Sequence, residues 1–245
     1  MRLESYLLTE GRTKSISRDV ALDLVRKNCK QMIKTKFKTE FYRGIDGAID
    51  FGVIDPSKFT RKSRNTTNYY TLMIDNLPSW KAYPKRSKSI ICSTDREMAS
   101  RYSSGQNALR VIPYDGTTIG VCSGVDIWWS FDTTSGPLFL LNNKIDGILK
   151  QLEGFNASNE LKWKNLVSLM SDADKLKDTI RTNIGEWEKS NKPLLSVLES
   201  MINPKKNGFK IAKIGDSLPR DREVWTDSKC VLISSGEYGD FMEAL

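Results

Sequence analysis

The chain has 245 residues, 38 Lys or Arg against 30 Asp or Glu, a net charge of +8, and no histidine. Without imidazole, Ser-His-Asp and Cys-His nucleophilic triads and histidine-based zinc sites are excluded. An enzyme with this composition must work with carboxylates, hydroxyls, Lys, Arg or a cofactor.

The spacing of apolar residues predicts a helix that begins at Ser15 or Ser17 and runs to about residue 36. A short strand over 40–45 follows and ends in a glycine turn. Residues 51–65 are expected to form a polar loop. A second helix is predicted over 68–76, after Thr66 or Thr67, and it is expected to stop before Pro78.

A strand over 87–93 leads directly into a helix for which Asp95 is a natural N-cap. Two further strands, near 109–112 and 118–122, are joined by a turn rich in proline, aspartate and glycine. The stretch 138–201 is rich in Lys, Glu and Leu, and predicts two or three helices.

Strand character returns over 209–214, 223–226 and 229–234. Strands that precede and follow the helical stretch need each other to form a sheet. The sequence therefore predicts an α+β fold in a single domain over 11–245, with a helical insertion at about 138–205.

The cysteines are far apart and form no CxxC pair, which favours reduced, buried thiols over a disulfide framework: Cys29, Cys92, Cys122 and Cys230. No apolar run approaches the ~20 residues of a membrane helix, and the first residues lack the apolar core of a signal peptide. We therefore expect a soluble protein of a reducing compartment, with no membrane partner.

Positive charge is concentrated in the first 100 residues, which carry 20 Lys or Arg and 11 Asp or Glu. Two basic clusters stand out there: Lys58, Arg61, Lys62 and Arg64, then Lys81, Lys85, Arg86 and Lys88. Basic residues with aromatics between them are typical of a nucleic-acid surface. A solvated basic face fits the same pattern, as does a field that attracts a phosphate-bearing small molecule or an acidic protein.

Motifs that bind phosphates are absent: there is no GxGxxG and no GxxxxGK[ST], which argues against a Rossmann dehydrogenase or a P-loop enzyme. Three short features at predicted strand ends remain: Arg43 in Phe-Tyr-Arg-Gly, Ser93-Thr94-Asp95, and Asp221-Arg222-Glu223. Taken singly, they are explained by a surface ion pair, a helix cap and an edge-strand glutamate.

Together and in this order, these features resemble the R-S-E class of ADP-ribosyltransferases, the family of cholera-toxin-like and clostridial-toxin-like enzymes. That family has an arginine on its first core strand, a Ser-Thr-Ser strand end, and a late [Glu/Gln]-x-Glu with the catalytic glutamate. Here Asp95 replaces the third serine, and Asp221 the residue two before Glu223. The resemblance implies a split β-sandwich of two small, mainly antiparallel sheets with flanking helices.

The resemblance also implies NAD as a substrate, no metal, and a role for each matching residue. Glu223 would hold the ribose 2′-hydroxyl and favour the oxocarbenium-like centre. Arg43 would grip the pyrophosphate, and Ser93 would orient the glutamate. The backbone of Gly44 would let nicotinamide approach closely. Asp221 would orient or deprotonate an acceptor, most simply an arginine guanidinium of a protein.

The NAD-binding residues implied in this way are Tyr42, Arg43, Gly44, Tyr70, Ser93 and Thr94. For Tyr70, packing in a helical core fits equally well. Nicotinamide leaves as a neutral molecule, so the reaction needs no general acid and no histidine. The histidine-containing H-Y-E class of poly(ADP-ribose) polymerases is excluded by the composition.

Residues 1–10 resemble the short targeting peptides of internal head proteins in large tailed phages, which are cut after a Leu/Ile-x-Glu tripeptide such as Leu8-Thr9-Glu10. Such phages package ADP-ribosyltransferases and inject them to modify host proteins. This resemblance implies a virion protein that reaches the host cytoplasm and takes a host protein as acceptor. A frayed amphipathic N-terminus fits the same residues.

Other functions stay open at this point. An NAD glycohydrolase would use the same three features. A non-catalytic basic protein could bind nucleic acid inside a virion through the two basic clusters. A degenerate transferase fold could serve as an inhibitor or docking module.

Overall fold

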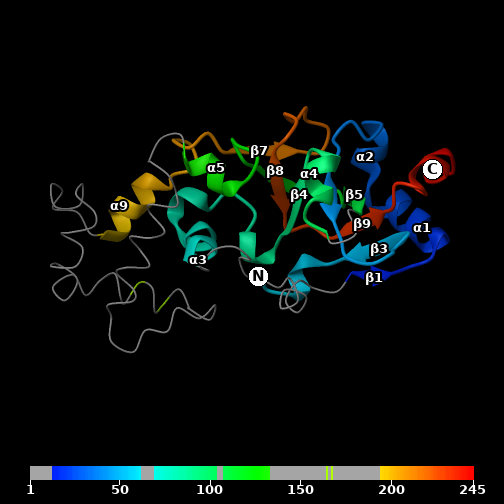
Figure 1. Cartoon of the computed structure of the whole chain (residues 1–245), viewed down its shortest axis with the longest axis horizontal. Coiled ribbons are helices and arrows are strands. Elements are labelled where there is room, and N and C mark those ends of the chain that lie inside the picture. Colours follow the sequence, from blue (N-terminus) through cyan, green and yellow to red (C-terminus); the bar gives the residue numbers. More distant parts are fainter. Residues whose placement is uncertain (1–12, 62–68, 104–106, 133–163, 165–166, 168–193) are drawn as a thin grey trace.

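The structure is a computed structural model that describes residues 13–61, 69–103, 107–132, 164, 167 and 194–245 (Figure 1). The expectations for residues 1–10 lie outside these residues, as do those for most of the helical insertion. Among the described residues, all four cysteines are free and buried, as the sequence predicts.

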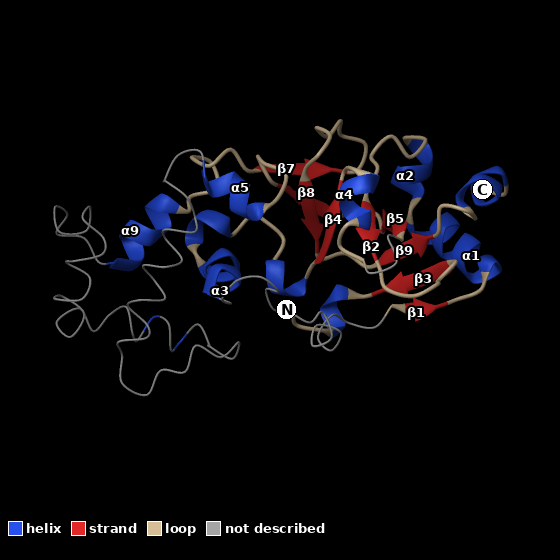
Figure 2. Cartoon of the chain, viewed as in Figure 1, coloured by secondary structure: helices blue, strands red, loops and turns tan. Residues whose placement is uncertain are grey.

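Nine described strands form one antiparallel sheet in the order β1-β3-β9-β5-β2-β4-β8-β6-β7. Their bounds are β1 Lys14–Ser15, β2 Tyr42–Gly44, β3 Phe51–Ile54, β4 Ile90–Ser93, β5 Ala108–Pro113, β6 Thr118–Val121, β7 Lys210–Lys213, β8 Glu223–Thr226 and β9 Cys230–Ile233. Short helices lie around this sheet (Figure 2). The predicted α+β class is confirmed.

The helices that the structure describes are α1 Arg18–Asn28, α2 Lys30–Lys34, α3 Tyr69–Asn76, α4 Arg96–Ser100, α5 Ile127–Asp132, α9 Leu194–Met201 and α10 Tyr238–Glu243. Both predicted N-caps are confirmed. The Ser17 hydroxyl accepts a hydrogen bond from the Val20 amide at 3.4 Å, and the Asp95 carboxylate accepts one from the Met98 amide at 2.8 Å.

The long helix predicted to residue 36 is wrong, because it breaks at Cys29 into α1 and α2. The backbone at this break is hydrogen-bonded to Asp115, a residue far along the chain. The Asp115 carboxylate accepts from the amides of Lys30 and Gln31 at 2.9 and 2.8 Å, while the Asp115 amide donates to the Asn28 carbonyl at 2.7 Å. This carboxylate satisfies the first amides of a new helix, so α2 starts there.

The polar loop predicted over 51–65 is also wrong at its start, where Phe51–Ile54 forms β3 between β1 and β9. Phe51 and Ile54 are buried. Three more elements carried no prediction: β1, α5 and the C-terminal α10.

The expected division into two sheets is replaced by one hydrogen-bonded ladder, because β2 pairs with β5 on one side and with β4 on the other. The joint between the halves is narrow, since the β2–β4 register consists of Tyr42 opposite Ser93. The sheet can therefore bend sharply at this point.

The inner face of the bent sheet carries one buried cluster with strand residues from both halves: Ile54, Ile90, Cys92, Leu109, Val111, Ile119, Val121, Ala212, Val224, Cys230 and Leu232. None of its members lies in a described helix. Since strand residues of both halves belong to this one buried cluster, the inner faces of the two halves cover each other.

The outer face is covered by helices. At one end of the molecule α1 and α10 pack on β3, β9 and β5 through a cluster that includes Val25, Ile112 and Phe241. At the other end, Trp225 of β8 lies among Trp80, Tyr83 and Phe209, with ring centroids 6.0 to 6.4 Å from its own. This outer face of β8 also carries Glu223, two residues earlier.

Candidate active site

The three sequence features come together on adjacent strands in the middle of the sheet. Ser93 ends β4 and lies directly opposite Glu223, the first residue of β8. Ser93 also lies opposite Tyr42 of β2. The strands β2, β4 and β8 are thus neighbours, although β8 is far from the others in sequence. A cross-strand row of Tyr42, Ser93 and Glu223 lies on one face of the sheet.

Arg43 is one residue further along β2, so its side chain leaves the opposite face of the strand. It lies opposite Leu109, a member of the inner cluster, and its Nη1 donates to the Ile91 carbonyl at 2.6 Å. The structure therefore brings Ser93 and Glu223 onto one face and places Arg43 on a neighbouring strand with its guanidinium on the inner side.

The two oxygens of the Glu223 carboxylate have different surroundings. Oε1 accepts a hydrogen bond from Nη2 of Arg86 at 2.6 Å, and the Cys122 thiol donates to the same oxygen at 3.8 Å. Oε2 has no hydrogen-bond partner within the described part of the chain, and 15% of the Glu223 side chain is exposed. One oxygen is held from inside and the other is open to a ligand.

The Ser93 hydroxyl makes a local contact in the described structure. This buried group accepts a hydrogen bond from the Asp95 amide at 3.0 Å, which helps turn the chain from β4 into α4. No hydrogen bond links Ser93 to Glu223 in the described structure. The hydrogen bond to the Glu223 carboxylate comes from Arg86 instead.

Arg86 lies in a short 3-10 turn, η4 (Arg86–Lys88), and only 4% of the residue is exposed. Its guanidinium carbon is 5.5 Å from the centre of the Trp225 ring. Burial acts to lower the pKa of Arg86, but the negative groups around it, Glu223 foremost, and the hydrogen bond to Glu223 together outweigh burial, so the pKa is raised. Burial, and then the negative charge of Glu223, raises the pKa of the Cys122 thiol well above its usual value. At neutral pH Arg86 is therefore a guanidinium and Cys122 a neutral thiol.

Thr94 fastens the loop that precedes Glu223. Its hydroxyl donates to the Pro219 carbonyl at 2.8 Å and accepts from the Arg222 amide at 3.0 Å. Its own amide donates to the Arg222 carbonyl at 2.9 Å. Thr94 was predicted to bind NAD, and the structure shows it as the anchor of this loop.

Thr94→Val is expected to loosen the loop without disturbing the sheet. The substitution keeps the shape but leaves the Pro219 carbonyl and the Arg222 amide without their side-chain partner, at a cost of about 1 kcal/mol. Limited proteolysis with trypsin, which cuts after Arg220 and Arg222, should be faster than in the wild type. Thr118→Val, on the partly exposed face of β6, is the matched control. Equal cleavage rates in the two variants would contradict this anchoring role.

Asp221 precedes Glu223 in a left-handed conformation, with φ of 57°, and is exposed. Its backbone carbonyl accepts from the Arg222 guanidinium at 2.9 Å. Asp221 thus lies in the exposed loop directly before β8.

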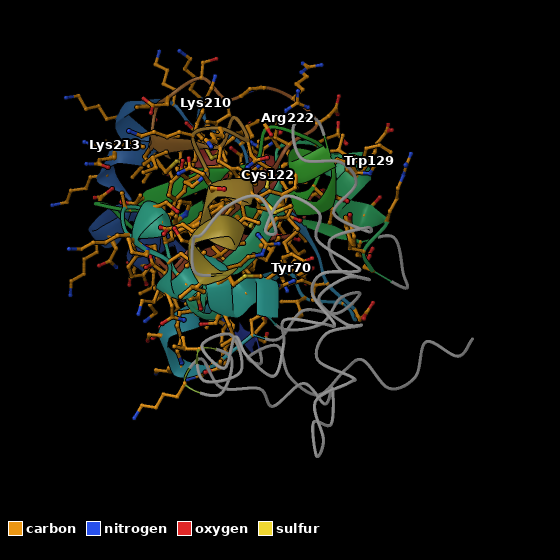
Figure 3. All side chains as sticks on the ribbon, turned by 90° about the vertical axis from the view of Figure 1, so that its left-hand side faces the viewer. Tyr70, Cys122, Trp129, Lys210, Lys213 and Arg222 are labelled. Atoms are coloured by element: carbon orange, nitrogen blue, oxygen red, sulfur yellow. The ribbon has the colours of Figure 1, made fainter. Side chains whose placement is uncertain are left out.

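The remaining predicted NAD-binding residues serve the packing of the fold. A Cβ on Gly44 would lie 2.3 Å from the Ala99 carbonyl oxygen, so this glycine allows α4 to pack on β2. The buried Tyr42 ring carries a hydroxyl that donates to Glu40 at 2.9 Å. Tyr70 is 4% exposed on α3, which places it in the core, the alternative left open by the sequence. Figure 3 shows Tyr70 on this end of the molecule, below Cys122.

Sequence reasoning missed Arg86, Cys122 and Tyr102 as neighbours of the carboxylate. Tyr102 follows α4, is 53% exposed, and its pKa is raised first by partial burial and then by the charge of Glu223. Arg86 stands in a basic run that reads as a solvated face, and no local pattern marks it as buried.

A pocket of about 330 Å³ opens elsewhere, beside the ends of β5 and β9. Its lining includes Asp50, Arg96 and Asn107, and none of the predicted site residues. In the described part of the chain, no group of three or more His, Cys, Asp or Glu side chains could hold a metal ion. None of the described helices has the length and apolar character that a membrane span needs.

Comparisons of the chain with protein-family models, with curated proteins and with solved structures found no match.

Proposed function

We propose that the protein is a mono-ADP-ribosyltransferase that transfers ADP-ribose from NAD to a protein side chain and releases nicotinamide. The observation that carries the proposal is the meeting of the three sequence features on β2, β4 and β8, with Ser93 opposite Glu223. The bent sheet with a shared inner core supports an ADP-ribosyltransferase-like fold.

Transfer of ADP-ribose requires the protein mainly to position NAD and to stabilise the charge that develops during the reaction. Cleavage of the bond between ribose and nicotinamide develops positive charge on the ribose, as in glycoside hydrolysis. A fixed carboxylate beside that centre stabilises the charge. Glu223 suits this role because Oε1 is held by Arg86 while Oε2 is open. Nicotinamide is neutral once released, so the step proceeds without a general acid.

Arg43 is assigned to the pyrophosphate of NAD, and Asp221 to the acceptor. For Arg43 this requires the guanidinium to leave the Ile91 carbonyl and to reach the phosphate oxygens from the inner side of the sheet, opposite the face that carries Glu223. For Asp221 the exposed carboxylate stands two residues before Glu223, where an acceptor guanidinium would approach. The acceptor as a host protein, and packaging in a virion, rest on the resemblance of residues 1–10.

Nucleic-acid binding through the first-half basic clusters is less well supported. Arg86 is buried against Glu223, and the Lys88 ammonium donates to the Phe59 carbonyl and the Thr60 hydroxyl at 2.9 and 2.8 Å. Two members of the second cluster therefore serve internal contacts. A phosphate backbone would need these charges on the surface.

The proposal is tested with NAD labelled in two places. The purified chain is incubated with a bacterial lysate and NAD that carries its label either in the adenylate phosphate or in the nicotinamide ring. Transfer predicts that protein bands retain the adenylate label, that nicotinamide is released, and that no band retains the ring label. Excess unlabelled ADP-ribose should not compete, since the enzyme uses NAD itself.

The same experiment separates the alternatives. Release of nicotinamide without label on protein would identify an NAD glycohydrolase. If circular dichroism shows that the chain is folded, but nicotinamide is not released and no protein is labelled, the proposal is contradicted. Mass spectrometry of a labelled band then gives the acceptor residue.

A further inference from the structure

We propose that Arg86 is the residue that positions the Glu223 carboxylate for reaction, the role that the family resemblance gives to Ser93. This inference rests on the proposed transferase function. It adds to the site a positioning residue that acts through Glu223 and does not itself touch the substrate.

The geometry distinguishes the two candidates clearly. Arg86 reaches Oε1 of Glu223 with Nη2 at 2.6 Å, a short hydrogen bond between charged groups. The Ser93 hydroxyl accepts from the Asp95 amide at 3.0 Å and makes no hydrogen bond to Glu223 in the described structure. Although Ser93 lies opposite Glu223 in the sheet, the carboxylate is oriented by the arginine.

Arg86 is itself held firmly. Pro84, two residues before Arg86, is tied to β8, because its carbonyl accepts a hydrogen bond from the Trp225 indole N–H at 2.9 Å. Ser87, the residue after Arg86, is tied to α3, because its amide donates to both oxygens of Asp75 at 3.3 and 3.2 Å. The guanidinium then lies over the Trp225 ring. A group fixed on three sides can hold its partner to the tolerance that catalysis requires.

The buried ion pair of Arg86 and Glu223 is not expected to add much to the stability of the fold. Its role is therefore better explained by the orientation that it gives to the Glu223 carboxylate. A buried ion pair seldom outweighs the cost of removing two charges from water. Nη1 of Arg86 is buried and has no hydrogen-bond partner among the described residues, an arrangement that costs further free energy. What the pair provides is a defined orientation, with Oε1 turned inward and Oε2 left for the ribose hydroxyl.

The test compares Arg86→Met and Arg86→Lys with the wild type, using nicotinamide release as the readout. Misplacement of the carboxylate should lower kcat about 100-fold in Arg86→Met. The dissociation constant of NAD, measured by calorimetry, should stay near that of the wild type. Arg86→Lys keeps the charge but loses the planar fork, so its kcat should lie between the two.

Arg110→Met is the matched control, because Arg110 forms a similar ion pair with Glu40 at 2.7 Å and stacks on Tyr238. Its kcat should equal that of the wild type. In Arg86→Ala, guanidinium ion at concentrations far below those that denature proteins should restore part of the turnover by filling the vacated site, whereas urea should not. A merely structural role for Arg86 would give no such rescue.

The outcomes separate this inference from the function on which it rests. A wild type that turns over no NAD defeats the transferase proposal. An active wild type together with an Arg86→Met variant of equal kcat overturns the role of Arg86. A loss that follows only the fraction of unfolded chain, with no rescue by guanidinium, also overturns it.

Discussion

Glu223→Gln is expected to lower nicotinamide release by about a thousand-fold, the effect of removing one fixed charge-stabilising group from an active site. Glutamine has the same shape but carries no charge, so it cannot offset the positive charge that develops on the ribose. Its amide oxygen can still accept from Arg86, which now donates to Oε1 at 2.6 Å. The fold should therefore persist, and the loss should appear in kcat.

The control is Glu243→Gln on α10, an exposed carboxylate at the far end of the molecule from β8 (Figure 1). Its turnover should match that of the wild type. Both variants are compared by circular dichroism, which confirms that they are folded before their rates are measured. Wild-type turnover in a folded Glu223→Gln variant would remove Glu223 from the reaction.

Local sequence patterns located the strands that bear the site because each is a short apolar run with a clear stop. The predicted strand over 223–226 is β8 to the residue, and the strand before Asp95 ends at Ser93. Their neighbouring positions in the sheet were implied only by the family resemblance, since no local pattern fixes which strands pair. The register of Ser93 with Glu223 agrees with that implication.

The errors arose where a distant residue decides the local structure. The predicted first helix breaks at Cys29 because Asp115, 85 residues beyond Lys30, supplies a cap for α2. The run at Phe51–Ile54 contains a glycine and reads as a loop, yet it becomes a strand because β1 and β9 flank it. Neither the cap from Asp115 nor the pairing with β1 and β9 can be predicted from the residues adjacent in the sequence.

Arg86 shows the same limit within the site. A run of Lys and Arg is usually a solvated face, and all three interpretations of this run that the sequence left open place its charges on the surface. The fold instead turns one member of the run under β8, where Trp225 and Glu223 present an aromatic face and a carboxylate on alternate residues of the same side. Once the strand order is known, the outer face of β8, with Glu223 and Trp225 side by side, can be recognised as the binding place of the Arg86 guanidinium.

Trp225→Ala is expected to cost about 3–5 kcal/mol of the free energy of unfolding, the usual price of deleting a large aromatic side chain from a core. Trp225 is 0% exposed. Its ring stacks on Tyr83 at 6.0 Å with an interplanar angle of 17°. A Cβ on Gly120 would lie 2.2 Å from the indole, so the indole packs directly on the backbone of β6 and its removal leaves a cavity there.

Urea denaturation followed by circular dichroism measures this loss, because that signal does not depend on the deleted fluorophore. The matched control is Trp129→Ala on α5, whose side chain is 60% exposed, and its stability should change by no more than about 0.5 kcal/mol. Equal losses in the two variants would show that the aromatic cluster does not support this end of the sheet.

Because Arg86 lies over the Trp225 ring and holds Glu223, Trp225→Ala should also reduce turnover in the fraction that stays folded. Core and site share one face of β8, so a loss of packing there becomes a loss of carboxylate placement.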